Sequence, residues 1–245
     1  FSGEIPNYVD AVFETASGLT TTGASIIENV EVCSQGILFW RSFTHWIGGM
    51  GVLVFVLAIV PMAKTRGVHL MRAEVPGPTV GKIAPKSSSN ALILYGIYSG
   101  LTVIEAVLLL FGGIGVFDAV TTAMSTAGTG GFSVRNAGIA AYESAYVEWV
   151  VGFFMIVFGV NFNLYYLMLL RRFKIVFKSE ELRVFLAIVA VSTVIMGINA
   201  TEYYGDFGVA IRKAFFQTGA IISTTGFGGV EFMNWPMLCH SVILV

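Results

Sequence analysis

The sequence has little charge and few residues able to bind metals. Only 12% of its 245 residues are Asp, Glu, Lys or Arg, about half the share of roughly 25% that is usual in soluble domains. So little charge cannot cover a water-facing surface, which excludes a soluble enzyme, a coiled coil and a disordered chain. The formal net charge of −1 argues against nucleic acid as a partner, because nucleic-acid binding needs a basic face.

Metal, disulfide and hydrolase chemistry also lack candidates. Cys33 and Cys239 lie far apart with no CxxC pair, so they form neither a metal site nor a disulfide framework. No GxSxG elbow accompanies His45 or His240, and no Walker lysine follows the glycine-rich run 128–131. We therefore expect that the protein is not an enzyme and that this chain holds no organic cofactor.

What the sequence does have is hydrophobic length. Its hydrophobic share is 56% and its mean hydropathy is +0.79. A membrane-spanning helix needs about 20 mostly apolar residues, and four stretches qualify: 36–62, 91–117, 147–170 and 182–199. A fifth begins near Trp235 and stops at Val245. Because the chain opens in a polar segment without a signal-peptide pattern and closes inside an apolar stretch, we expect a fragment of a longer protein.

The cations indicate which connecting segments face the cytoplasm. Ten of the fourteen Lys and Arg residues lie in segments 63–88 and 171–183, and residues 1–35 contain none. By the positive-inside rule those two segments are cytoplasmic, and the other three face outside.

Each outer segment contains a short, moderately apolar run and then a Thr/Gly cluster. Aligned on the steps Thr22-Gly23, Thr129-Gly130 and Thr225-Gly226, the clusters lie 107 and 96 residues apart. We interpret this as an internal repeat of helix, short re-entrant helix, Thr/Gly loop and helix. A single cluster would also suit a helix C-cap and turn, but three aligned clusters on one side of the membrane favour the repeat.

A non-helical loop is tolerated at membrane depth only when it is buried in protein or lines a water-filled cavity. Three such loops entering from one side predict a shared central cavity. Glycine gives access to positive φ, so that successive carbonyls turn towards one axis and replace the hydration shell of a cation. The short helices would direct the negative ends of their dipoles at this cavity, which favours cations.

Several polar residues lie within or beside the apolar stretches, where ionisable groups are functional candidates. We expect Arg41 to reach the outer interface, and for His45 both that role and a role beside the pore remain open. Glu105 favours a hydrogen bond to a neighbouring helix. Asn161 and Asn163 suit either the pore cavity or contacts between helices. The glycines of segment 48–51 predict close helix packing.

Charged residues flank the short runs as well. Asp10 and Asp118 precede them and are expected to be N-caps. Arg212 and Lys213 occupy that place in the third segment, where a cation opposes the helix dipole, and only interface anchoring is expected of them.

These residues resemble the Trk/Ktr/HKT superfamily of potassium transporters, and within it the bacterial TrkH/KtrB type of membrane subunit. The matching phrases are TTTGAS at 20–25, FWRSFTHWIGGMGVLVF at 39–55, KIAPKSSSNALILYGIY at 82–98, STAGTGGFS at 125–133 and TGAIISTTGFGG at 218–229. The resemblance implies an all-α membrane protein of helix–re-entrant pore loop–helix units. These units are related to the K+-channel fold and arranged with pseudo-fourfold symmetry around one pore.

By the resemblance, residues 1–62 are the first repeat without its outer helix, 63–170 the complete second repeat, and 171–245 the start of the third. The fourth repeat and the family's gating loop would lie beyond Val245, so we expect that the chain does not conduct alone. The filter residues carried over are Thr21, Thr22, Gly23 and Ala24, then Gly128, Thr129, Gly130 and Gly131, then Thr224, Thr225, Gly226 and Phe227. K+ would bind at Thr22, Gly23, Thr129, Gly130, Thr225 and Gly226.

The implied function is K+ uptake across the bacterial cytoplasmic (inner) membrane. The implied partners are the lipid bilayer, a second copy in a homodimer, and a cytoplasmic TrkA/KtrA-like subunit that gates transport and itself binds NAD or ATP. The Trk type is favoured over the Ktr type. The alternative is a Na+-coupled secondary carrier with re-entrant hairpins. It is disfavoured because such carriers usually contain inverted repeats, whereas all three hairpins here enter from outside.

Overall fold

The computed structural model describes residues 3–51, 87–230 and 232–244. Within these ranges the chain is helical and contains no strand, as predicted. The helices are α1 (Tyr8–Leu19), α2 (Gln35–Gly49), α5 (Ser87–Phe111), α6 (Val116–Ala127), α7 (Ala145–Gly159), α8 (Phe162–Leu169), α9 (Phe173–Lys178), α10 (Glu180–Tyr204), α11 (Phe207–Ile222) and α12 (Met237–Leu244), with 3-10 turns η1 (Val30–Val32), η2 (Gly138–Tyr142) and η3 (Phe232–Asn234).

Polar side chains fix where several helices begin. The side chains of Asn7, Ser34, Ser144, Ser179 and Asp206 each accept a hydrogen bond from a backbone N–H in the first turn of α1, α2, α7, α10 and α11. These N–H groups have no partner within the helix, so the caps stabilise the helix starts.

Asp10 and Asp118 do not cap their helices, and that prediction is wrong. Asn7 caps α1, and α6 begins after Gly115 without a side-chain cap. Each helix starts two residues before its aspartate. The carboxylates therefore lie in the first turn, where a negative charge faces the positive end of the helix dipole.

Among the described residues, two helices are long and apolar enough to cross a membrane, Leu92–Phe111 of α5 and all of α10, and the bent pair of α7 and α8 would be a third if it forms one span. The α10 helix confirms the span predicted at 182–199. The span predicted at 91–117 is confirmed only as far as Phe111. Gly112 and Gly113 turn the chain there, with φ of +81° at Gly113, and Val116 already belongs to α6.

The span predicted at 147–170 is not one helix. It is divided into α7 and α8, which meet at an angle of 90°. Asn161 lies at the break, where its side chain accepts a hydrogen bond from the Asn163 N–H at 3.1 Å and donates one to Glu181 of α10 at 3.3 Å. Of its two predicted roles, the interhelical contact is the one observed. Asn161 is therefore the N-cap of α8, and it lies within an apolar run at the point where α7 ends.

The two remaining predicted spans are seen in part. The α2 helix covers residues 36–49 of the first span, and residues 52–62 lie outside the described ranges. The fifth span, predicted from near Trp235, begins as α12 at Met237.

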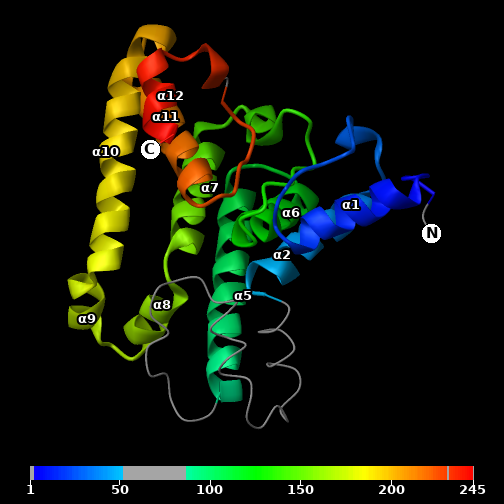
Figure 1. Cartoon of the computed structure of the whole chain (residues 1–245), viewed down its shortest axis with the longest axis horizontal. Coiled ribbons are helices and arrows are strands. Elements are labelled where there is room, and N and C mark those ends of the chain that lie inside the picture. Colours follow the sequence, from blue (N-terminus) through cyan, green and yellow to red (C-terminus); the bar gives the residue numbers. More distant parts are fainter. Residues whose placement is uncertain (1–2, 52–86, 231, 245) are drawn as a thin grey trace.

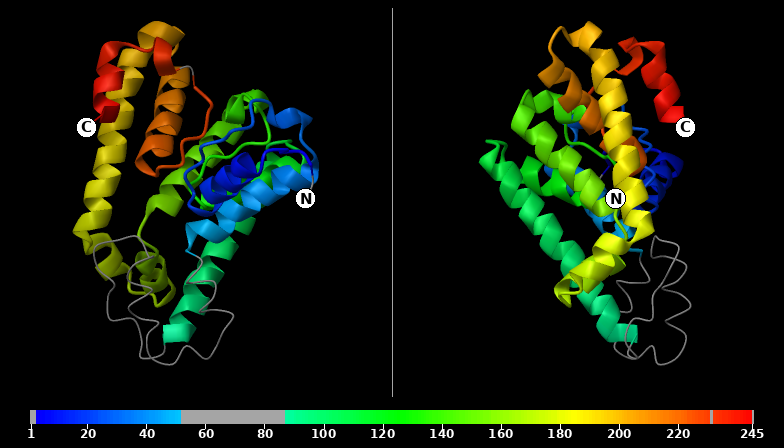
Figure 2. Two further views of the ribbon diagram at one scale, coloured as in Figure 1. Left: turned by 45° about the vertical axis from the view of Figure 1, so that its right-hand side comes forward. Right: turned by 90° about the vertical axis from the view of Figure 1, so that its left-hand side faces the viewer.

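Each of the short helices α1, α6 and α11 packs against a neighbouring helix in the chain: α1 on α2, α6 on α5 and α11 on α10. Figure 1 shows α10 along one side of the molecule, with α11 and α12 beside its upper part and with α1 and α2 on the opposite side. The turned views of Figure 2 keep α11 beside α10, and these two helices pack along each other. The α2 helix packs on α6, and α7 packs on α11.

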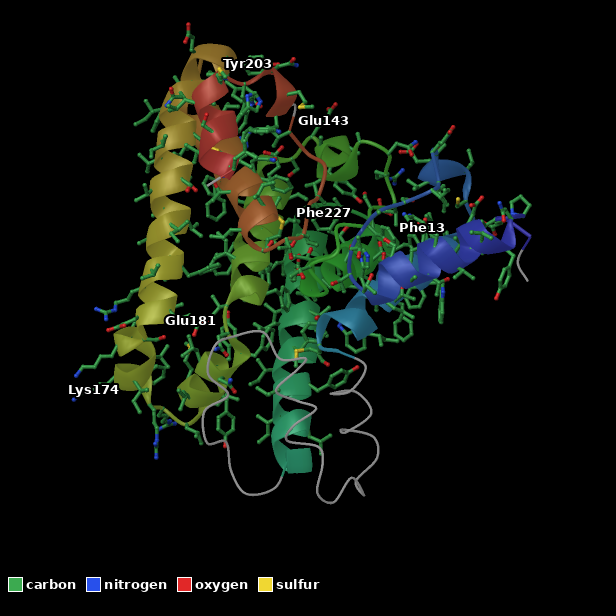
Figure 3. All side chains as sticks on the ribbon, in the orientation of Figure 1. Phe13, Glu143, Lys174, Glu181, Tyr203 and Phe227 are labelled. Atoms are coloured by element: carbon green, nitrogen blue, oxygen red, sulfur yellow. The ribbon has the colours of Figure 1, made fainter. Side chains whose placement is uncertain are left out.

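The basic segment 171–183 and the segments predicted to face outside lie near opposite ends of α10. Lys174 and Glu181 lie near the lower end of α10 in Figure 3, whereas Tyr203 and Glu143 lie towards the upper end of the molecule. The segment predicted to be cytoplasmic, 171–183, is therefore far from segments predicted to face outside.

Glycine allows the closest approach between α2 and α6. A Cβ atom at Gly49 would lie 2.5 Å from the Cα atom of Gly128 and 2.7 Å from the hydroxyl oxygen of Tyr98. The close packing predicted for this glycine-rich segment is therefore confirmed, and it brings the end of α2 against the residues that follow α6.

Candidate functional site

Three loops with one shared backbone conformation follow the short helices α1, α6 and α11. In each loop a threonine and, two residues later, a glycine have positive φ. The angles are +55° at Thr21 and +74° at Gly23, +51° at Thr129 and +75° at Gly131, and +60° at Thr224 and +69° at Gly226. We call residues 21–24 loop 1, residues 129–132 loop 2 and residues 224–227 loop 3.

The predicted alignment of the second loop is wrong by one residue. Gly131, not Gly130, has the backbone conformation of Gly23 and Gly226, so Gly130 takes the place of Thr22 and Thr225. Gly128 is the C-cap of α6, with φ of −72°, and Phe132 completes the loop. The run 128–131 contains three glycines, and the end of α6 decides which of them takes the left-handed conformation.

The loops touch one another through backbone atoms, and the contacts repeat. A Cβ atom at Gly23 would overlap with the carbonyl oxygen of Gly130, and one at Gly131 would overlap with the carbonyl oxygen of Thr225. In both cases the glycine with positive φ faces the carbonyl that precedes the equivalent glycine in the next loop. The corrected alignment is therefore supported by a second, independent observation.

A cavity of about 220 Å³ opens where the three segments meet. Gly23, Gly131 and Gly228 line it from the three segments, together with Ser25 and Ser133. The Ile139 N–H donates a hydrogen bond of 2.9 Å to the carbonyl oxygen of Gly228, which joins the segments after loops 2 and 3. Of the predicted filter residues, Gly23 and Gly131 line this opening, whereas the third segment reaches it through Gly228, two residues after Gly226.

His45 of α2 lies directly behind loop 2. Its side chain is fully buried, its Nδ1 atom is 3.0 Å from the hydroxyl of Ser125, and its ring stacks on Phe132 at 4.0 Å between centroids. A Cβ atom at Gly130 would lie 2.4 Å from the His45 ring. Of the two roles left open for His45, the structure therefore favours support of the loop over a place at the interface.

Arg41 does not reach the outer interface, and that prediction is wrong. Its side chain is buried and its Nε donates to Glu14 Oε1 at 2.6 Å. A guanidinium cannot lose its proton, so a buried carboxylate is the partner that makes its burial tolerable. Glu14 of α1 occupies that place because α1 packs against α2.

A second buried cluster joins α7 to α11. Glu148 of α7 accepts hydrogen bonds from Arg212 Nε at 2.8 Å and from Lys213 Nζ at 2.6 Å. These cations oppose the dipole of α11, and the carboxylate of Glu148 offsets that effect. The only role expected of Arg212 and Lys213 was anchoring at the interface. Their main contact is instead the ion pair with Glu148.

A third charged group lies on the outer side, between α6 and η2. Arg135 donates to Asp118 Oδ2 at 3.0 and 2.8 Å, and the Tyr142 hydroxyl donates to the same oxygen at 3.1 Å. Burial raises the pKa of Tyr142 to about 12, and the hydrogen bond to Asp118 raises the pKa of Arg135. The tyrosine thus stays a neutral donor, and the segment after loop 2 is held to the start of α6.

Glu105 is fully buried on α5. Thr126 of α6 is its polar neighbour, but neither carboxyl oxygen makes a hydrogen bond of ordinary geometry. The expected hydrogen bond to a neighbouring helix is therefore not formed in full.

The sequence analysis assigned no role to Glu14, Ser25, Phe132 or Glu148. The sequence does contain a signal that could have identified Glu14 and Glu148. An acidic residue within an apolar segment needs an opposite charge, and Arg41 and the Arg212-Lys213 pair are the basic residues nearest the apolar stretches of the outer half. Which acid meets which base depends on how the helices pack, and the sequence does not contain that directly.

The comparisons with known proteins now bear on this arrangement. The model of the TrkH family, described as a cation transport protein, matches residues 1–245. The chain belongs to the TrkH family.

The relatives agree with this membership. The Trk system potassium uptake protein TrkH of Escherichia coli (strain K12) is 34% identical over an alignment of 249 positions, which covers 98% of this chain and 51% of the relative. The TrkG protein of the same strain is 31% identical, over 97% of this chain and 49% of its own length. The crystal structure of the potassium transporter TrkH from Vibrio parahaemolyticus matches with a TM-score of 0.79 and 29% identity, over 97% of this chain and 49% of that chain.

Membership confirms the predicted resemblance and makes the chain part of a multi-pass membrane protein of a transport family rather than an enzyme. The chain spans about half the length of the curated relatives that it matches.

Proposed function

We propose that the protein carrying this chain takes up K+ through a filter of backbone carbonyls, and that loops 1, 2 and 3 form three of the filter's four strands. The observation that carries the proposal is the repeated contact of a left-handed glycine with the carbonyl of the next loop, at Gly23 with Gly130 and at Gly131 with Thr225. Rings of carbonyl oxygens are the ligands that replace the hydration shell of K+.

The loops lie at the helix ends that suit a cation. The α1, α6 and α11 helices end at Leu19, Ala127 and Ile222, directly before the loops. A helix C-terminus carries a partial negative charge. Three such ends directed at one opening make a site for a cation without any side-chain carboxylate among its ligands.

The corrected alignment assigns the ion contacts. The carbonyls of Thr22, Gly130 and Thr225 would form one layer of ligands, and those of Gly23, Gly131 and Gly226 the next. Thr129, which the sequence analysis placed with the first layer, belongs one level before it. Ala24, Phe132 and Phe227 end the three strands.

The same contact pattern leaves room for a fourth strand. A Cβ atom at Gly226 would meet nothing within 4 Å among the described residues, whereas Gly23 and Gly131 each face a carbonyl. A fourth repeat, outside this chain, would supply the carbonyl that faces Gly226 and complete the pseudo-fourfold arrangement related to the K+-channel fold.

Uptake needs no chemistry on the ion. In a bacterial cytoplasmic membrane the potential contributes about 2.3 kcal/mol per charge per 100 mV and draws cations inwards. We assign the basic segment 171–183, at the end of the molecule where Lys174 lies (Figure 3), to the contact with a cytoplasmic TrkA/KtrA-like subunit that binds NAD or ATP. A homodimer is part of the same proposal.

The test is ion flux into liposomes that contain the protein carrying this chain. We expect K+ flux to exceed Na+ flux, and Gly130→Ser to reduce this preference, because the serine side chain would meet the ring of His45. A K+ flux that requires a Na+ gradient and is unchanged in a folded Gly130→Ser variant would contradict the filter and support the Na+-coupled carrier.

A further inference from the structure

We propose that Arg41 is a positioning residue that sets the spacing between loops 1 and 2 and thereby the ion preference of the filter. The inference rests on the proposed function and assigns a role to a buried ion pair behind it. The ion itself would not touch Arg41.

The guanidinium joins the two repeats through separate donors. Its Nε donates to Glu14 Oε1 at 2.6 Å, its Nη2 donates to the Ser25 hydroxyl at 3.0 Å, and its Nη1 donates to the Ser133 carbonyl oxygen at 3.4 Å. Arginine has five N–H donors in a rigid planar fork. One side chain can therefore hold three acceptors in a fixed relation to each other.

The acceptors lie at equivalent points of the two loops. Ser25 follows Gly23 by two residues, and Ser133 follows Gly131 by two residues. The guanidinium thus links the segments that directly follow the carbonyl contacts of loops 1 and 2. A change in its length or shape would alter the separation of the two loops.

The link is held in place on both sides. Glu14 accepts hydrogen bonds from the Ser25 hydroxyl and from the Ile26 N–H, each at 3.0 Å, and the guanidinium lies 4.1 Å from the centre of the Phe132 ring. Glu14 and Arg41 are both 4% exposed. Buried charges without water to replace a lost partner keep one geometry, because any other leaves a charge unpaired.

The segments of loops 2 and 3 are connected by a lysine instead of a guanidinium. There Lys213, held by Glu148, donates to the carbonyl oxygen of Gly229 at 3.4 Å. Lys213 belongs to the short helix α11, and the neighbouring Arg212 also contacts Glu148. Among the described residues, Arg41 is thus the guanidinium with contacts to the segments of two loops.

Loop spacing bears directly on selectivity. The preference of a carbonyl filter for one cation depends on the size of its cavity and on the number and field of its carbonyls. Loops 1 and 2 already approach so closely that Gly23 has no room for a Cβ atom. A small shift between them changes the distance from carbonyl to ion.

The experiment compares Arg41→Lys with Arg212→Lys in the protein carrying this chain, reconstituted in liposomes. Both variants keep the positive charge and the pairing with a glutamate, but the three donors of lysine leave one nitrogen and cannot reach acceptors that are spread around a planar guanidinium. We expect Arg41→Lys to lower the ratio of K+ to Na+ flux by about fivefold, which corresponds to about 1 kcal/mol. Arg212→Lys should leave this ratio unchanged.

Glu14 contacts the segment after loop 1 both through Arg41 and directly, through Ser25 and Ile26. We expect Glu14→Gln to lower the flux ratio in the wild-type background and to have a clearly smaller effect when Arg41→Gln is already present, with folding checked by thermal unfolding of each detergent-solubilised variant. An unchanged ratio in folded Arg41→Lys protein would overturn the positioning role. Wild-type protein without any preference for K+ would instead overturn the proposed function.

Discussion

Single glycines in the loops meet two requirements that can be separated. Gly131 has positive φ and also faces the Thr225 carbonyl, whereas Gly113 has positive φ of +81° but would meet nothing within 4 Å. A side chain at Gly113 would be strained only by the backbone conformation. A side chain at Gly131 would also displace the neighbouring loop.

We therefore expect Gly131→Ala to be much more damaging than Gly113→Ala. The left-handed conformation alone costs roughly 1–3 kcal/mol, and Gly113→Ala should lose no more stability than this and keep the K+ to Na+ flux ratio. Gly131→Ala should also lower the flux ratio. Thermal unfolding in detergent and liposome flux measure the two effects. Equal losses and equal ratios in the two variants would show that the contact between loops has no role.

His45 should contribute to stability through its burial behind loop 2. Deleting a large buried side chain costs roughly 2–5 kcal/mol, and His45→Ala also leaves the Ser125 hydroxyl without its partner. His240 is a matched control, since its ring also lies against a phenylalanine, at 4.5 Å from Phe232, but is only partly buried. We expect His240→Ala to cost clearly less in denaturant unfolding, and a reversed order would contradict this view of His45.

At the scale of helices, apolar length predicted the positions of α5 and α10, because a long apolar run has few stable alternatives in a membrane. It failed where a polar residue interrupts the run. Asn161 divides α7 from α8 by capping the second helix, and its partner Glu181 is 20 residues away. The register of loop 2 failed for a similar reason, since the end of α6 and not the Thr-Gly step decides which glycine is left-handed.

We expect the loss of Asn161, which caps α8, to lower the free energy of unfolding more than the loss of Ser144, which caps α7. Replacing an N-cap by alanine costs roughly 1 kcal/mol. Ser144→Ala should show this cost alone, whereas Asn161→Ala should lose more, because the contact with Glu181 is removed as well. Denaturant unfolding of the two variants in detergent measures the difference. Equal costs would mean that Glu181 does not stabilise the break.

At the scale of the whole molecule, buried charges join helices that are distant along the chain. Glu14 and Arg41 join α1 to α2, and Glu148 with Arg212 and Lys213 joins α7 to α11. None of these pairings follows from spacing along the chain. Their partners are 27, 64 and 65 residues apart, so only the packing of α1 on α2 and of α7 on α11 brings them together.

The Glu148 cluster should therefore decide how firmly α11 is held to α7. Glu148→Gln leaves two partly buried cations without a carboxylate, and removing one partner of a buried ion pair costs roughly 3–5 kcal/mol. Glu143→Gln removes the same charge at an exposed position five residues earlier in the chain and should cost little. Because the Glu148 carboxylate is only 6% exposed, salt should not screen its contacts as it screens surface charges. We expect the difference between the two variants in denaturant unfolding to persist at high salt. A difference that vanishes in salt would mean that the cluster is open to solvent and does not hold α7 and α11 together.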